Sequence, residues 1–296
     1  MRSKKRRWIR NALLITMIIC LFMSGKTYYE SMRNRQEQEN LRKLVEAAKL
    51  EGITGQIGDS VAEGTGASES PMEPYSVKGA AETPSASERL PEQEASVQEE
   101  STENPPILAQ YEALYQANDD LVGWLSIEGM VIDYPVMRSE DDEFYLHHNF
   151  QGEEDKYGCL YVRNRADVDT PGTNFIIYGH NMKDGSMFGD LDLYRKKSFC
   201  QEHGVIRFDT LYEERSYEIV AVFLSQVYAE QDEEFKYYQF YEAETEEEFQ
   251  YFYENIKELA LYDTGVTAEY GDTFLTLSTC AYHVTDGRLV VVAKRI

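Results

Sequence analysis

Apolar residues in the C-terminal two thirds of the chain fall into short runs separated by turn residues and charges. Eight of these runs have the alternation and the β-branched or aromatic content of strands. They are Val122–Ile127, Val131–Met137, Cys159–Val162, Asn174–Tyr178, Val205–Phe208, Tyr217–Val227, Thr273–Cys280 and Arg288–Lys294. Eight short strands in succession indicate a mainly β fold, either a sandwich or a closed barrel, and not a parallel α/β sheet.

Two segments in the same region carry apolar residues at helical spacing. The first covers about Pro106 to Asp119, with Leu108, Tyr111, Leu114 and Tyr115 on one face. The second follows Thr245, which precedes Glu248 by three residues and therefore forms a capping box. Its apolar stripe consists of Phe249, Phe252, Ile256 and Leu259. We expect one helix before the first strand and another before the penultimate strand.

The N-terminus has a different pattern. Asn11–Gly25 is an uncharged, largely apolar run of about 15 residues, preceded by Arg2, Lys4, Lys5, Arg6, Arg7 and Arg10. That length is typical of a signal peptide, but no A-x-A-like cleavage site follows it. Trp8, Tyr28 and Tyr29 could lie at the two interfaces of a bilayer. We therefore predict a basic cytoplasmic N-terminus and membrane anchor over residues 1–29, with the rest of the chain extracellular.

Between the predicted anchor and the predicted strands the composition changes twice. Residues 30–50 are charged, with Leu41, Leu44, Val45 and Ala48 at helical spacing, and predict a helical stalk. Residues 51–104 are rich in Gly, Ser, Glu, Pro and Thr and poor in large apolar residues. Such a segment buries too little surface to offset its ordering entropy, so we expect a disordered acidic linker. The folded domain covers residues 105–296.

Charge and cysteine content narrow the possible functions. The formal net charge is −24, which repels phosphate backbones and argues against nucleic acid as a partner. The acidic clusters Glu140–Glu143 and Glu230–Glu234 are typical of solvated loops, so we predict no metal and no cofactor. The four cysteines include no CxxC pair. Cys159 and Cys200 are best explained as small core residues, although a disulfide between them remains an alternative.

Three residues at predicted strand ends could carry chemistry. Cys280 ends an apolar strand, where solvent and substrate can reach its thiol, and His180 follows another strand in a Gly-His-Asn turn. A nucleophilic cysteine needs a proton acceptor nearby, and His180 could supply it if the two strand ends are neighbours. Arg288 opens the last strand and could donate to a developing oxyanion. Spacing alone also allows a core cysteine, a turn histidine and an edge-strand arginine.

Sequence motifs in this region resemble those of the sortase family. Leu277-Ser-Thr-Cys280 followed by Arg288 is similar to the ending of sortases, and Tyr178-Gly-His180-Asn resembles their histidine motif. The resemblance runs from about Leu114 to the C-terminus. It includes the runs Asp120-Leu-Val-Gly-Trp-Leu-Ser-Ile, Ile132-Asp-Tyr-Pro-Val and His180-Asn-Met-Lys-Asp-Gly-Ser-Met-Phe-Gly189. The helix before the first strand and the late helix are similar to those of class B sortases.

The resemblance implies a closed eight-stranded barrel and a set of roles. Cys280 would be the nucleophile, His180 the acid and base, and Arg288 the oxyanion stabiliser. The residues that would bind substrate or order its site are Tyr178, Ser278, Thr279 and Leu146. Class B enzymes have an Asn–Leu pair near Tyr145-Leu146; here Leu146 fits, while Asp142 replaces the Asn. We therefore expect a preferred sorting signal that differs from the usual one of class B.

The resemblance also implies a function. A sortase cuts a C-terminal sorting signal of secreted proteins after its Thr, through a thioacyl-enzyme. It then transfers the acyl group to an amine of a peptidoglycan precursor or a pilin. Two alternatives remain from the residues themselves: a secreted cysteine peptidase, in which water replaces the amine, and an inactive anchored binding module.

Overall fold

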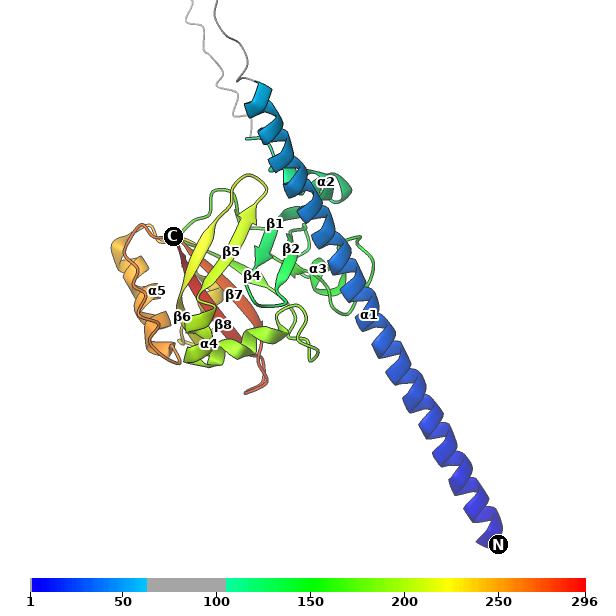
Figure 1. Cartoon of the computed structure of the whole chain (residues 1–296). Coiled ribbons are helices and arrows are strands. Elements are labelled where there is room, and N and C mark those ends of the chain that lie inside the picture. Colours follow the sequence, from blue (N-terminus) through cyan, green and yellow to red (C-terminus); the bar gives the residue numbers. More distant parts are fainter. Residues whose placement is uncertain (1, 63–104) are drawn as a thin grey trace, which may run out of the picture.

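The computed structural model describes residues 2–62 and 105–296 as one long helix and a β-barrel domain with helices on its outside (Figure 1). The helices are α1 (Arg2–Ala62), α2 (Ala109–Ala117), α3 (Phe144–His147), α4 (Lys197–Glu202) and α5 (Glu246–Leu259). Two short 3-10 helices, η1 (Gly189–Arg195) and η2 (Tyr237–Gln239), lie in the connections between strands.

The domain is built on eight strands, each of which overlaps the run predicted for it. They are β1 (Leu121–Ser126), β2 (Asp133–Met137), β3 (Leu160–Tyr161), β4 (Asn174–Tyr178), β5 (Val205–Thr210), β6 (Ser216–Gln226), β7 (Phe274–Cys280) and β8 (Gly287–Arg295). They pair in the order β1-β2-β3-β4-β7-β8-β6-β5 and close into a barrel. The β2–β3 and β4–β7 pairs are parallel, and the other pairs are antiparallel. The prediction of a mainly β fold with eight strands is confirmed.

Side chains alternate between the two faces of each strand, so the barrel has an inner and an outer core. The inner core of β4, β7 and β8 contains Phe175, Ile177, Leu275, Leu277, Leu289 and Val291. The residues between them face outward, where Ile176, Phe274, Val290 and Val292 pack with α5. This outward face matters for function, because the candidate catalytic residues continue it at the strand ends.

Helix α5 covers the outer core and begins where the sequence predicts. The Thr245 hydroxyl accepts a hydrogen bond from the Glu248 amide at 3.2 Å, as an N-cap does. Phe249, Phe252 and Ile256 are almost fully buried, and burial of such a side chain contributes about 1.5–3 kcal/mol. Leu259, predicted as the end of the stripe, is exposed.

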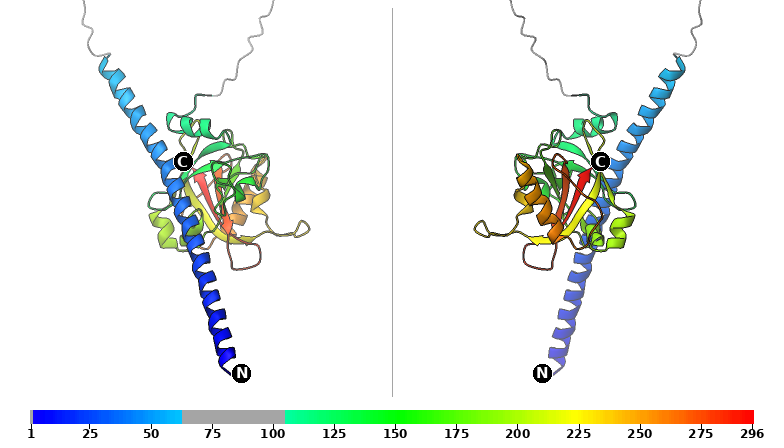
Figure 2. Two further views of the ribbon diagram at one scale, coloured as in Figure 1. Left: turned by 90° about the vertical axis from the view of Figure 1, so that its right-hand side faces the viewer. Right: turned by 90° about the vertical axis from the view of Figure 1, so that its left-hand side faces the viewer.

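Helix α1 crosses the domain beside α2 and α3, and its N-terminal part projects beyond the domain (Figures 1 and 2). Leu41 and Val45 of α1 are buried in one cluster with Tyr111 and Leu114 of α2 and with Trp124 of β1. The helix predicted for residues 30–50 is therefore packed against the domain. It continues to Ala62, into the segment predicted as a linker. The remaining linker residues, 63–104, lie outside the described residues.

The predicted membrane anchor is contradicted. Within residues 2–62 and 105–296, no helix combines the length and the hydrophobicity needed to cross a bilayer. The uncharged run Asn11–Gly25 falls short of the ~20 apolar residues that a span requires, and Arg10 and Lys26 bound it on either side. The expectation of a single-pass protein with a cytoplasmic N-terminus and an extracellular domain is therefore not supported.

Candidate active site

The end of β7 lies between the ends of β4 and β8, and the pairing register sets the geometry of the site. Tyr178 of β4 pairs with Ser278 of β7, and Cys280 of β7 pairs directly with Arg288 of β8. Continuing the parallel β4–β7 register by one alternation brings His180 level with Cys280. Because alternate residues share a face, these five residues follow the outward face of the barrel at one edge of the sheet.

Two short hydrogen bonds join the β4 and β7 ends beyond their ladder. The buried Thr279 hydroxyl donates to the carbonyl oxygen of Gly179 at 2.7 Å. The Asn181 side-chain amide donates to the carbonyl oxygen of Cys280, also at 2.7 Å. These bonds lie on both sides of His180 in the sequence, so the backbone that carries the imidazole is fixed to the backbone that carries the thiol.

The imidazole of His180 is oriented by a backbone carbonyl. Its Nε2 lies 2.7 Å from the carbonyl oxygen of Leu146, next to the end of α3. A carbonyl oxygen can only accept, so Nε2 carries a hydrogen in this arrangement. Nδ1 is then the nitrogen left for proton transfer, and it accepts a proton when the ring is neutral.

Cys280 and Arg288 are both half-buried at this rim. The guanidinium Nη1 of Arg288 donates to the carbonyl oxygens of Asp286 and Gly287, at 3.1 and 3.0 Å. Among the described residues, no hydrogen bond joins the Cys280 thiol to His180 or to Arg288. The pairing of β4, β7 and β8 thus brings the chain segments that carry these three residues to one edge of the sheet.

A groove of about 730 Å³ opens beside this rim. Three predicted residues, Leu146, Tyr178 and Arg288, line it together with residues that the sequence analysis did not single out, among them Tyr161, Arg163 and Tyr237. It is therefore bordered by α3, the β3 exit, β4, η2 and β8. Ser278 lies just below its wall, since its hydroxyl is 2.7 Å from the Tyr237 hydroxyl.

Tyr178 is the central aromatic residue of the groove. Its ring stacks on Tyr161 at 5.6 Å between centroids, and the guanidinium of Arg163 lies 5.3 Å from the ring centre. Its hydroxyl is buried and has no hydrogen-bond partner among the described residues. Burial, with the neighbouring Tyr241 hydroxyl, raises the pKa of Tyr178 well above its ordinary value, so the hydroxyl keeps its proton at neutral pH.

Asp142, where this sequence departs from the class B pattern, also lines the groove. Its carboxylate accepts a hydrogen bond from the backbone amide of Asn164 at 2.7 Å, which connects the segment before α3 to the segment after β3. The exposed carboxylate thus stands at the rim of the groove, on the same side as Leu146. An acid at this place gives the groove a charge that an Asn would not provide.

The other two cysteines of the domain belong to its hydrophobic core. Cys159 and Cys200 are both buried and free, in different hydrophobic clusters, as small core residues. Burial raises the pKa of both thiols, most strongly for Cys159. Within the described parts of the chain, no group of three His, Cys, Asp or Glu side chains is arranged to hold a metal ion.

Comparison with known proteins adds the evidence of sequence similarity. A family model of the Sortase domain matches residues 125–296, more than half of the chain. The chain belongs to the sortase family. Sortase B of Listeria monocytogenes is 34% identical over 189 residues, which cover 62% of this sortase and 72% of the relative. Sortase B of Staphylococcus aureus is 31% identical over 192 residues, which cover 63% and 75% of the two chains.

Solved structures agree with the sequence comparison. The Staphylococcus aureus sortase B–substrate complex has a TM-score of 0.58 and 30% identity to this sortase, and the match covers 64% of this chain and 86% of that one. The protein is thus a cysteine transpeptidase of the sortase B type. The resemblance read from the motifs around His180 and Cys280 is confirmed at the level of the family.

Proposed function

We propose that this sortase cleaves a C-terminal sorting signal of secreted proteins and transfers the acyl group to an amine of the cell wall or of a pilin. The observation that carries the proposal is the strand register. Cys280 pairs with Arg288, and the parallel β4–β7 ladder ends at the Tyr178–Ser278 pair, two residues before His180 and Cys280. A groove of about 730 Å³ is lined by Tyr178 and Arg288. A nucleophile, a base and a cationic donor beside a peptide-sized groove form the set that acyl transfer needs.

In the first half-reaction, the Cys280 sulfur attacks the backbone carbonyl carbon of the Thr residue in the sorting signal. The thiol proton passes to His180, and Arg288 turns from its backbone carbonyls to donate to the developing oxyanion. The C–N bond then breaks, and His180 gives its proton to the departing amine. The product is a thioester on Cys280, which conserves the energy needed to make a new amide bond.

In the second half-reaction, an acceptor amine attacks the thioester carbonyl. His180 takes a proton from the attacking amine and the Cys280 sulfur leaves, to be reprotonated by His180. The hydrogen bond from Nε2 to the Leu146 carbonyl keeps the same ring nitrogen directed to the reaction in both steps. A fixed tautomer is useful here because one histidine must act first as acid and then as base.

The groove supports binding of an extended peptide. The Tyr178 ring offers aromatic surface to the peptide, and the Leu146 side chain adds apolar surface at the rim. Ser278 acts through Tyr237, whose hydroxyl it holds. With Asp142 at the rim, we expect a preference for a signal that differs from one suited to an Asn at that position.

The test is a peptide assay on the purified chain. A library of fluorogenic peptides, each with Thr before the scissile bond, is incubated with and without an added amine such as triglycine. We expect an acyl-enzyme on Cys280 by mass spectrometry and a ligated product that depends on the amine. If the rate and the products of cleavage were the same with and without the amine, the protein would be a peptidase and the proposed transfer would be refuted.

The control is Cys280→Ala, which removes the nucleophile from a half-buried rim position and should leave the fold intact. We expect no acyl-enzyme and no ligation from this variant. Near-normal turnover would exclude Cys280 as the nucleophile. Failure of the wild-type chain to process any peptide, together with retained peptide binding, would favour an inactive binding module.

A further inference from the structure

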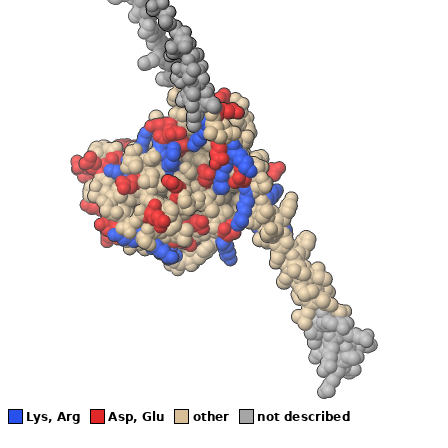
Figure 3. Space-filling model, in the orientation of Figure 1, with Lys and Arg blue, Asp and Glu red and all other residues tan. Residues whose placement is uncertain are grey.

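The face of α1 that touches the domain changes character along the helix. Near Leu41 and Val45 the contact is apolar and reaches the cluster under α2. One to two turns earlier, the polar residues Asn34 and Gln38 are buried, and beyond them Glu30, Ser31 and Arg33 form hydrogen bonds and ion pairs with the domain. Acidic and basic side chains alternate along the line where α1 crosses the domain (Figure 3). Because hydrogen bonds are directional, a polar contact fixes the position of the contacted segment more strictly than apolar packing does.

The first target of this polar contact is the segment that leads from α3 to β3. Arg33 of α1 donates to Asp155 at 2.6 Å, and the Asp155 side chain is only 3% exposed. Glu30 pairs with Lys156 at 2.5 Å. Asp155 in turn donates its backbone amide to the His147 carbonyl at 2.8 Å. His147 directly follows Leu146, so this contact ends one residue from the carbonyl that orients His180.

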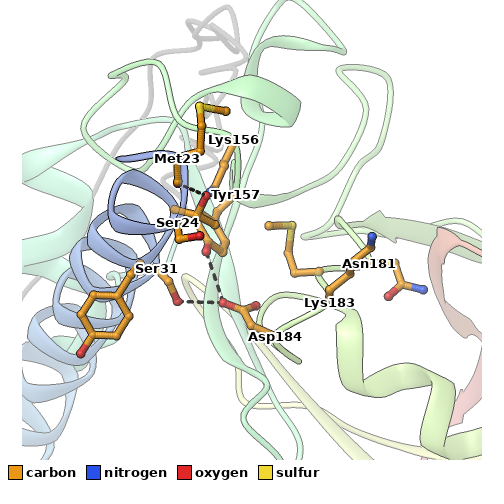
Figure 4. A pocket seen from close by; sticks show the side chains of 11 residues that line it. Met23, Ser24, Ser31, Lys156, Tyr157, Asn181, Lys183 and Asp184 are labelled. Atoms are coloured by element: carbon orange, nitrogen blue, oxygen red, sulfur yellow. Dashed lines mark hydrogen bonds between the residues drawn. The ribbon is translucent and has the colours of Figure 1, made fainter. Parts of the chain in front are cut away.

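The second target is the loop that follows His180. Asp184 accepts hydrogen bonds from Ser31 of α1 at 2.9 Å and from Tyr157 at 3.2 Å (Figure 4). It also accepts one from Ser186 at 2.6 Å. Partial burial acts to raise the pKa of Asp184, but the hydrogen bonds from Ser186 and Ser31 hold it below its ordinary value. The carboxylate is therefore ionised at neutral pH and holds three segments together.

The loop that Asp184 closes is short and begins at the site itself. Asn181, which holds the Cys280 carbonyl, also bridges to Met187 across the loop, and the Phe188 amide donates to the His180 carbonyl at 2.9 Å. Gly185 has a φ of +82°, which lets the chain turn back directly after Asp184. A shift of Asp184 would move both ends of a loop that starts at the catalytic imidazole.

From these contacts we infer that α1 positions His180 for catalysis, through Arg33 on Asp155 and Ser31 on Asp184. In this arrangement α1 is part of the scaffold of the active site, and Asp184 is a positioning residue that does not touch substrate. The Leu146 carbonyl holds the imidazole, and the Asn181–Asp184 loop continues directly from the His180 backbone; α1 contacts the segments next to both. A helix that served only as a tether would need neither contact.

The test compares three full-length variants, Arg33→Ala, Ser31→Ala and Asp184→Asn, with the control Lys43→Ala. The Lys43 side chain is 63% exposed, and its ion pair with Glu39 stays within α1. A misplacement of a reacting group by 1 Å can cost about 100-fold in rate, so we expect kcat to fall by roughly 10-fold or more in Arg33→Ala and Asp184→Asn. KM for the peptide should change less than kcat, since α1 does not line the substrate groove. Lys43→Ala should match the wild type.

Two further measurements separate positioning from stability. Thermal melts show whether each variant is folded at the assay temperature, and Ser31→Ala, which removes a single exposed hydroxyl, serves where Arg33→Ala does not fold. An Arg33→Lys variant, which keeps the ion pair with Asp155, should recover part of kcat. Folded Arg33→Ala and Asp184→Asn with wild-type kcat and KM would overturn the inference and leave α1 as a tether.

The inference rests on the proposed function, and the two can fail separately. The pH profile of Cys280 alkylation, followed by peptide mass spectrometry, needs no sorting signal. A profile that shifts in Arg33→Ala and Asp184→Asn, but not in Lys43→Ala, supports the positioning of His180 even where the peptide assay finds no substrate. An unchanged profile in all the variants contradicts the inference whatever the substrate is.

Discussion

The bond between the Thr279 hydroxyl and the Gly179 carbonyl offers a direct test of how the site is assembled. It is 2.7 Å long and buried, and it connects the residue before Cys280 to the residue before His180. Thr279→Val has nearly the same shape and lacks the hydroxyl. The substitution therefore removes the link between the β4 and β7 ends and leaves the Gly179 carbonyl without this partner.

The magnitude follows from burial. Leaving one buried polar group unsatisfied costs about 1–3 kcal/mol. For a domain of this size, each kcal/mol lowers Tm by about 2–4 °C, so we expect Thr279→Val to melt roughly 2–12 °C below the wild type. Because Gly179 precedes His180, we also expect kcat to fall by about 10-fold or more as the imidazole loses its fixed position.

The matched control is Thr279→Ser, which loses a buried methyl group but keeps the hydroxyl. It should lose about 1 kcal/mol of stability and retain kcat close to that of the wild type. Calorimetry and peptide turnover, both measured below the lowest Tm, give the two quantities for each variant. If Thr279→Val kept the wild-type Tm and kcat, the bond would contribute neither to stability nor to the placement of His180, and the reasoning would be refuted.

Two further predictions concern the rim and the buried thiols. Arg288→Lys should be nearly as damaging as Arg288→Ala, with kcat/KM lower by about 100- to 1,000-fold, because Lys lacks the planar fork of donors; near-normal turnover of the Lys variant would reduce the role of Arg288 to its charge. Iodoacetamide at pH 8 should label Cys280 and the exposed Cys20 in the folded protein, while Cys159 and Cys200, whose pKa values are raised by burial, should react only after unfolding. Labelling of Cys159 or Cys200 before Cys280, detected by peptide mapping, would contradict this prediction.

Local patterns in the sequence were sufficient for the strands and for the candidate chemistry. A strand repeats every two residues whatever it pairs with, so all eight strands could be located before their partners were known. The same holds for the Thr245 cap, because its partner Glu248 is three residues away. Cys280, His180 and Arg288 could be singled out as candidates because each stands at one end of an apolar run, and the family motifs that contain them predicted membership of the sortase family.

Only the tertiary structure decided what surrounds those residues. The Leu146 carbonyl that orients His180, the Tyr237 hydroxyl that holds Ser278, and the segments braced by α1 are all far in sequence from the groups they contact. No local periodicity marks such partners, since they depend on how the barrel closes and on which connections lie beside its rim. The prediction of a membrane anchor was wrong for a different reason. It was based on the composition of a short apolar run, whereas crossing a membrane depends on the continuous length of apolar helix. Helix α1 is charged on both sides of that run.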